Sequence, residues 1–69
     1  MKVIAENKKV CSTLHGDISL SPHGILFTFR VLFYSGSRYH GNLTFRDLPE
    51  VIDYLLDDCG FDLVTFKNK

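Results

Sequence analysis

The chain contains no tryptophan, only two cysteines and two prolines, and no long hydrophobic run among its 69 residues. No stretch approaches the roughly 18 apolar residues that a membrane-spanning helix requires, and the N-terminal apolar stretch is too short for a secretory signal. A cytoplasmic protein without a membrane segment is therefore expected. In a reducing compartment, Cys11 and Cys59 are expected to be buried or inert thiols rather than a disulfide.

Positive charge is absent from one long segment. Between Asp47 and Asp62 the sequence has no Lys or Arg, although the formal net charge of the whole chain is zero. This segment holds most of the carboxylates of the chain, namely Asp47, Glu50, Asp53, Asp57, Asp58 and Asp62. One surface element should therefore be strongly acidic and should attract basic partners.

The size of the chain limits the classes of function. A chain of this length forms one domain and buries only about 60% of its unfolded surface, which leaves little core for a deep catalytic cleft. The cysteines and histidines do not have the spacing of a zinc site, and no nucleophile has an identifiable orienting group. An enzyme is not expected, nor is a metal or a cofactor. Six Phe and three Tyr provide the apolar area that a core without staples needs.

Alternating hydrophobicity predicts a β-meander. Asp17–Ser21 reads as a strand, Pro22-His23-Gly24 as a turn, and Ile25–Tyr34 as the partner strand. The core face of this partner is predicted to consist of Ile25, Phe27, Phe29, Val31 and Phe33. After a turn at Ser35-Gly36-Ser37, the segment Arg38–Phe45 alternates again, with Tyr39 on its apolar side.

Weaker strands are predicted at Val3–Ala5 and Val10–Leu14, the second of which could join the Asp17 strand across a bend at Gly16. Asp47, Pro49 and Glu50 have the pattern of a helix start, and apolar residues recur every three or four positions up to Cys59.

A helix is therefore predicted over about Leu48–Cys59, ended by Gly60, followed by a short strand over Phe61–Phe66. The predicted fold class is α+β: an antiparallel β-meander of about four or five strands, one amphipathic helix packed on one face, and a short C-terminal strand.

The helix carries the first candidate site. Asp57 and Asp58 lie near the C-terminal end of the predicted helix, where each carboxylate lowers the stability by roughly 0.3 to 1 kcal/mol unless its charge is compensated. They are either solvated or paired with Lys67 or Lys69, or they form a stripe that binds a basic groove on a protein partner. The residues of this stripe are Glu50, Asp53, Asp57 and Asp58.

A second candidate site lies at the predicted turn after Tyr34. Arg38, Tyr39 and His40 are residue types that commonly dominate interface energetics, so they are candidates for partner binding. The alternative is that Tyr39 faces inward while Arg38 and His40 are solvated. Nucleic-acid binding through the same residues is not favoured, because three Arg and five scattered Lys make a thin basic field.

A third candidate surface is the second face of the sheet. One helix covers only one face, which leaves Leu26, Leu32 and Tyr34 on the other, either as an apolar patch or covered by the N-terminal hairpin. Small monomers seldom leave several large apolar groups exposed together, so a homodimer or a partner footprint is expected there.

In size, architecture and charge layout, with the acidic segment DLPEVIDYLLDDCGFD as its main feature, the chain resembles the small phage-encoded inhibitors of bacterial defence, the anti-CRISPR proteins. That resemblance implies a non-enzymatic inhibitor in the host cytoplasm. It also implies that Glu50, Asp53, Asp57 and Asp58 stand in for phosphates on a nucleic-acid-binding surface of the partner. The alternatives are a homodimeric structural or regulatory protein and a weak nucleic-acid-binding regulator.

Overall fold

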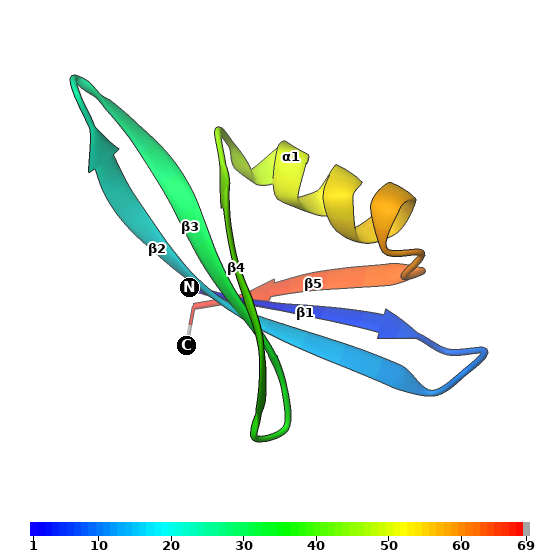
Figure 1. Cartoon of the computed structure of the whole chain (residues 1–69). Coiled ribbons are helices and arrows are strands. Elements are labelled where there is room, and N and C mark those ends of the chain that lie inside the picture. Colours follow the sequence, from blue (N-terminus) through cyan, green and yellow to red (C-terminus); the bar gives the residue numbers. More distant parts are fainter. Residues whose placement is uncertain (69) are drawn as a thin grey trace.

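The structure, a computed structural model, describes residues 1–68 and is a five-stranded antiparallel sheet with one short helix on one face (Figure 1). The strand order is β4-β3-β2-β1-β5. The elements are β1 Lys2–Asn7, β2 Ser12–His23, β3 Leu26–Ser35, β4 Arg38–Phe45, α1 Leu48–Asp53, the π-helical turn η1 Tyr54–Asp58, and β5 Leu63–Lys67. The sequence prediction of an antiparallel sheet with one helix is confirmed, and the fold is mostly β.

β2 is one long strand rather than two. It continues through Gly16, which lies opposite Val3 on β1 and Phe33 on β3. A Cβ atom at Gly16 would be 2.7 Å from Val3 Cγ1 and 2.8 Å from Val31 Cγ1. Only glycine allows the sheet to stay this closely packed at that point, so the predicted bend is instead a site of close approach.

The turn between β2 and β3 lies at Gly24 and Ile25, so it begins two positions later and ends one position later than predicted. Pro22 is part of β2 and lies opposite Phe27. β1 pairs with β2 only as far as Asp17, so this part of β2 is an edge where a missing N–H removes no ladder hydrogen bond.

A β-bulge interrupts the pairing of β3 with β4. Phe33 lies opposite Gly41, but Tyr34 lies opposite Tyr39, so His40 has no partner on β3. The extra residue reverses the alternation on its N-terminal side. Tyr39 therefore lies on the Tyr34 face, and the expectation that it faces inward with the apolar residues of β4 is wrong.

The helix forms because its first turn is capped and its apolar stripe is covered by the sheet. The Asp47 carboxylate accepts a hydrogen bond from the Glu50 backbone N–H at 3.0 Å, and Pro49 occupies the first turn. The last turn is π-helical, and the Cys59 N–H donates to the Tyr54 carbonyl at 3.0 Å. Val51 and Leu55 from this helix are buried against the sheet.

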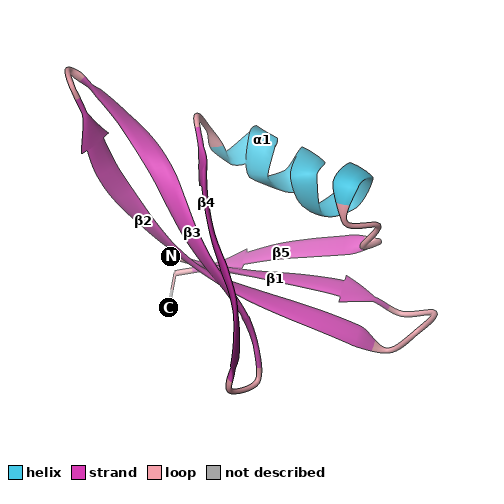
Figure 2. Cartoon of the chain, in the orientation of Figure 1, coloured by secondary structure: helices cyan, strands magenta, loops and turns pink. Residues whose placement is uncertain are grey.

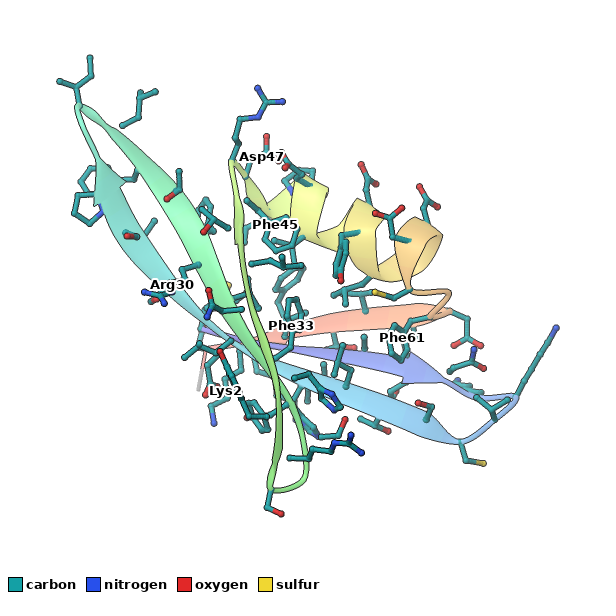
Figure 3. All side chains as sticks on the ribbon, in the orientation of Figure 1. Lys2, Arg30, Phe33, Phe45, Asp47 and Phe61 are labelled. Atoms are coloured by element: carbon teal, nitrogen blue, oxygen red, sulfur yellow. The ribbon has the colours of Figure 1, made fainter. Side chains whose placement is uncertain are left out.

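The core lies between the helix and the face of the sheet that it covers, here called the inner face (Figure 2). Phe33 and Phe45 point from the sheet towards the helix, whereas Arg30 points away from it (Figure 3). The buried residues are Val3, Ala5, Ile18, Val31, Phe33, Phe45, Val51 and Leu55. The prediction of a continuous core face on β3 is wrong at its N-terminal end, because Ile25 and Phe27 are exposed.

Candidate protein-binding surfaces

The acidic helix carries a shallow hollow on the side that faces solvent. The hollow measures about 260 Å³ and lies where the end of β4 meets the helix. Its lining combines aromatic and acidic side chains: Phe45, Tyr54, Glu50, Asp53, Asp57 and Asp58. The structure therefore brings together all four carboxylates predicted from the sequence and adds two aromatic rings. We call this surface the acidic groove.

The carboxylates of the segment differ in whether a local partner offsets their charge. Asp47 caps the helix, and Asp62 accepts a hydrogen bond from the Lys8 backbone N–H at 3.3 Å. Glu50 forms an ion pair with Arg46, with 3.5 Å between Oε2 and Nε. Within residues 1–68, Asp53 makes no ion pair, and the same holds for Asp57 and Asp58. Pairing with Lys67 is therefore not observed, and pairing with Lys69 lies outside the described residues.

The aromatic residues of the acidic groove remain uncharged. Hydrogen bonding with the Cys59 side chain, partial burial and the nearby Asp58 charge together raise the pKa of Tyr54 above its usual value of 10. Tyr54 therefore stays a neutral phenol at physiological pH and adds no negative charge. Its ring packs between two core rings, 5.5 Å from Phe45 and 5.9 Å from Phe33 between centroids.

The second predicted cluster lies elsewhere. Arg38, Tyr39 and His40 begin β4, whereas the acidic groove lies where that strand ends against the helix (Figure 1). Of the three, His40 comes nearest to the groove, because Tyr54 lines both the groove and the hollow beside His40. Tyr39 is exposed, and its hydroxyl accepts a hydrogen bond from the Asn42 side-chain amide at 2.9 Å. His40 Nε2 lies 2.8 Å from Ser35 Oγ.

The bulge gives His40 a place that the sequence did not indicate. His40 lines a hollow of about 370 Å³ on the inner face, beside the helix. The other lining residues are Leu14, Phe33, Gly41, Asn42, Leu43 and Tyr54. A bulge cannot be read from alternation alone, and the conformationally permissive Gly41, with φ 112°, is the only signal in the sequence that could have located it.

The predicted dimer face does not form one apolar patch. Leu26, Leu32 and Tyr34 share the face opposite the helix, here called the outer face, but Thr28 and Arg30 lie between Leu26 and Leu32. Tyr34 is only half-exposed because its ring stacks on His15, with 5.4 Å between centroids. Its hydroxyl donates to the Asp17 carboxylate at 3.5 Å.

Cys11 and Cys59 are both free thiols and form no disulfide with each other. Of the two alternatives predicted for them, buried or inert, burial is wrong, because both are exposed. Cys11 lies in the turn between β1 and β2 and has a positive φ of 53°. Within residues 1–68, no group of three or more His, Cys, Asp or Glu side chains is arranged to hold a metal ion. None of the described helices is long and apolar enough to cross a membrane.

A surface that the sequence analysis missed lies at the far end of β2 and β3. Leu20, Ile25, Leu26 and Phe27 are all largely exposed there. Ile25 and Phe27 had been interpreted as core, because alternation does not report whether a second layer covers the strand, whereas Leu26 had been assigned to the uncovered second face.

Comparison with other proteins found no match for this chain among protein families, curated proteins or solved structures.

Proposed function

We propose that this protein is a small non-enzymatic binding module whose acidic groove engages a basic surface of a protein partner. The observation that carries the proposal is that Asp53, Asp57 and Asp58 share one hollow without a cationic partner among residues 1–68. Unpaired carboxylates beside one another repel, and those near the C-terminal end of a helix also interact unfavourably with its dipole. A basic partner surface would relieve both costs.

The composition of the groove suits arginine in particular. A guanidinium group can pair with two carboxylate oxygens at once and can also stack on an aromatic ring. Tyr54, which is half-buried, provides an accessible ring in the same hollow as the carboxylates, whereas Phe45 lines the hollow but is buried. Cationic side chains over such rings gain about 0.5 to 2 kcal/mol, depending on how far they are desolvated.

A nucleic-acid-binding protein is the partner class that this chemistry fits best, because its surface is built to hold rows of phosphates with Arg and Lys. The proposed role is that of an inhibitor or regulator that occupies this surface in place of the nucleic acid, in the cytoplasm. Such a role is the one implied by the resemblance to anti-CRISPR proteins, which remains part of the proposal.

The test compares two variants with the same change in net charge. One carries Asp53→Asn, Asp57→Asn and Asp58→Asn, and it removes three negative charges from the groove. The control carries Thr13→Lys, Ser19→Lys and Thr44→Lys at exposed positions on the outer face, and it adds three positive charges there.

Wild type and both variants are immobilised, and proteins retained from a bacterial lysate are identified by mass spectrometry. We expect wild type and control to retain a basic nucleic-acid-binding protein that added oligonucleotide displaces, and the Asn variant to lose it at least tenfold. Equal retention by the Asn variant would show that the acidic groove does not bind the partner.

A homodimer through the outer face is the second candidate, because the helix covers only the inner face and Leu32 remains 38% exposed. It predicts that Leu32→Asp lowers self-association without unfolding the chain. A wild type that sediments as a monomer would exclude this candidate.

A further inference from the structure

The part of the β2–β3 hairpin from Ser19 to Arg30, here called the distal hairpin, extends beyond the helix (Figure 1). The molecule is accordingly elongated, with principal extents of 42 × 24 × 20 Å. Four large apolar side chains of the distal hairpin are exposed: Leu20 by 62%, Ile25 by 98%, Leu26 by 68% and Phe27 by 64%. Exposed apolar groups gathered in this way usually mark an interaction surface.

The distal hairpin is also uncharged over nearly its whole length. Between Ile18 and Phe29 the sequence has no Lys, Arg, Asp or Glu. On its inner face the cross-strand pairs are Leu20 with Phe29 and Pro22 with Phe27, all of them apolar. Two copies of this face can therefore meet without bringing like charges together, which a charged face could not do.

An apolar hollow lies at the base of the distal hairpin, where β1 begins beside β2. It measures about 270 Å³ and is lined by Met1, Ile18, Ser19, Leu20 and Phe29. At the opposite end of the hairpin, Ile25 projects from the turn almost wholly exposed. One hairpin thus carries both a protruding apolar side chain and a hollow large enough to receive one.

We infer that the distal hairpin binds the distal hairpin of a second copy of this chain in antiparallel orientation, with Ile25 of each copy seated in the hollow at the base of the other. Ile18 and Gly24 are six residues apart, so the two hairpins overlap over about 20 Å. A two-fold axis makes the contact reciprocal, since the turn of one hairpin reaches the base of the other at both ends.

The contact is made by side chains rather than by strand pairing. Ile18 already exchanges backbone hydrogen bonds with Met1, donating its N–H to the Met1 carbonyl at 2.7 Å. Pro22 has no N–H to donate at the free edge of β2. An added strand would find too few backbone groups there, whereas Leu20 and Phe27 on the inner face are exposed.

The area available matches a weak dimer. Leu26 lies on the outer face, so Leu20, Ile25 and Phe27 offer roughly 400 Å² per copy. Two hairpins then bury about 800 Å² in total, which is below the roughly 1,000 Å² of a stable specific interface. Dimerisation should therefore depend on concentration in the micromolar range rather than be permanent.

The first test measures self-association by sedimentation equilibrium. We expect wild type to dimerise, and Ile25→Asp and Phe27→Asp each to weaken the dimer at least tenfold. The matched control is Val10→Asp, which alters an apolar residue that is 69% exposed in the β1–β2 turn. Both hairpin positions are exposed, so circular dichroism should show the same fold in every variant.

The second test fixes the orientation. In a Cys11→Ser, Cys59→Ser background, chains carrying Ile25→Cys are mixed with chains carrying Leu20→Cys and are mildly oxidised. We expect linked dimers only in the mixture, because the turn of one copy meets the base of the other. Linkage of Ile25→Cys chains to each other in the absence of Leu20→Cys chains would overturn the antiparallel arrangement.

Three further outcomes would overturn the inference as a whole. These are a monomeric wild type, a dimer that Leu32→Asp disrupts but Ile25→Asp does not, and a monomer that binds lipid vesicles through the hairpin. The inference is independent of the proposed function, so the triple Asn variant of the acidic groove should dimerise as wild type does.

Discussion

The two halves of the β2–β3 ladder carry similar side chains on the same face but have different fates. In the half under the helix, Val31 is 0% and Phe33 is 5% exposed, whereas in the distal half Leu20 and Phe27 are mostly exposed. The helical segment has six residues in α1 and five in η1, about 16 Å in length, whereas the 12 residues of β2 span about 40 Å. Within residues 1–68, the helical segment is the layer that packs on the sheet, and it is too short to cover the whole length of β2 and β3.

This difference separates what stabilises the fold from what is left for binding. Apolar side chains contribute to folding only where a second layer removes them from water, so the distal hairpin contributes little to the free energy of unfolding. Its apolar surface is left unused within one copy. The stability of the chain and its self-association should therefore respond to different substitutions.

The sharpest test of this comparison replaces one phenylalanine in each half. Phe33→Ala should lower the free energy of unfolding by about 3 to 5 kcal/mol, because it opens a cavity beneath the helix. Phe27→Ala, on the same face of the same strand, should change it by less than about 0.5 kcal/mol. Urea denaturation monitored by circular dichroism, at a concentration where the protein is monomeric, measures both values. Equal losses would mean that the distal hairpin is covered in the monomer.

The second prediction concerns the closest packing in the covered half. Gly16→Ala should lower the free energy of unfolding by about 1 to 3 kcal/mol, because the new methyl group would overlap Val3 and Val31, both of which are stiff at χ1. In the Gly16→Ala background, Val3→Ala should cost less than it does in wild type, since it relieves one of the two overlaps. Additive losses in a denaturation cycle would contradict this account.

The sequence predicts the elements better than their limits, for a physical reason. Alternation and capping are local, so the strands around Val31 and Leu43 and the helix start at Asp47 can be read directly. The continuity of β2 through Gly16 depends on a close approach of Val3 and Val31 that no local pattern reports. The bulge at His40 depends in the same way on pairing with β3, and it reversed the face predicted for Tyr39.

The candidate sites were predictable to different degrees. The carboxylates from Glu50 to Asp58 are spaced at helical intervals, so their shared groove follows from the sequence. Tyr54 lies at the same intervals, but Phe45 could not be predicted there, because it reaches the groove from the end of β4. The distal hairpin was misread because Phe27 and Phe33 are indistinguishable by alternation, and only the position of the helix tells them apart.

The third prediction concerns a substitution that weakens the helix packed on the sheet. Asp47→Ala removes the acceptor that caps the helix and should lower the free energy of unfolding by about 1 kcal/mol. Asp53→Ala is the matched control and should not lower the free energy of unfolding, since Asp53 makes no ion pair within residues 1–68 and Ala favours a helix more than Asp does. Hydrogen exchange should become faster in the first turn of the helix for Asp47→Ala and should be unchanged in the distal hairpin. Faster exchange in both regions would mean that the two halves are coupled.

The smallest effect should have the opposite sign. Asp58 lies in the last turn of the helical segment, where a carboxylate faces the negative end of the helix dipole. Asp58→Asn should therefore raise the free energy of unfolding by about 0.3 to 1 kcal/mol at low salt and by less at high salt, because salt screens exposed charges. Thermal unfolding at two salt concentrations measures the difference, with Glu50→Gln near the start of the helix as a control that should not stabilise. A higher free energy of unfolding for Asp58→Asn, combined with loss of partner binding in the triple Asn variant, would mean that Asp58 contributes to binding although it destabilises the helix.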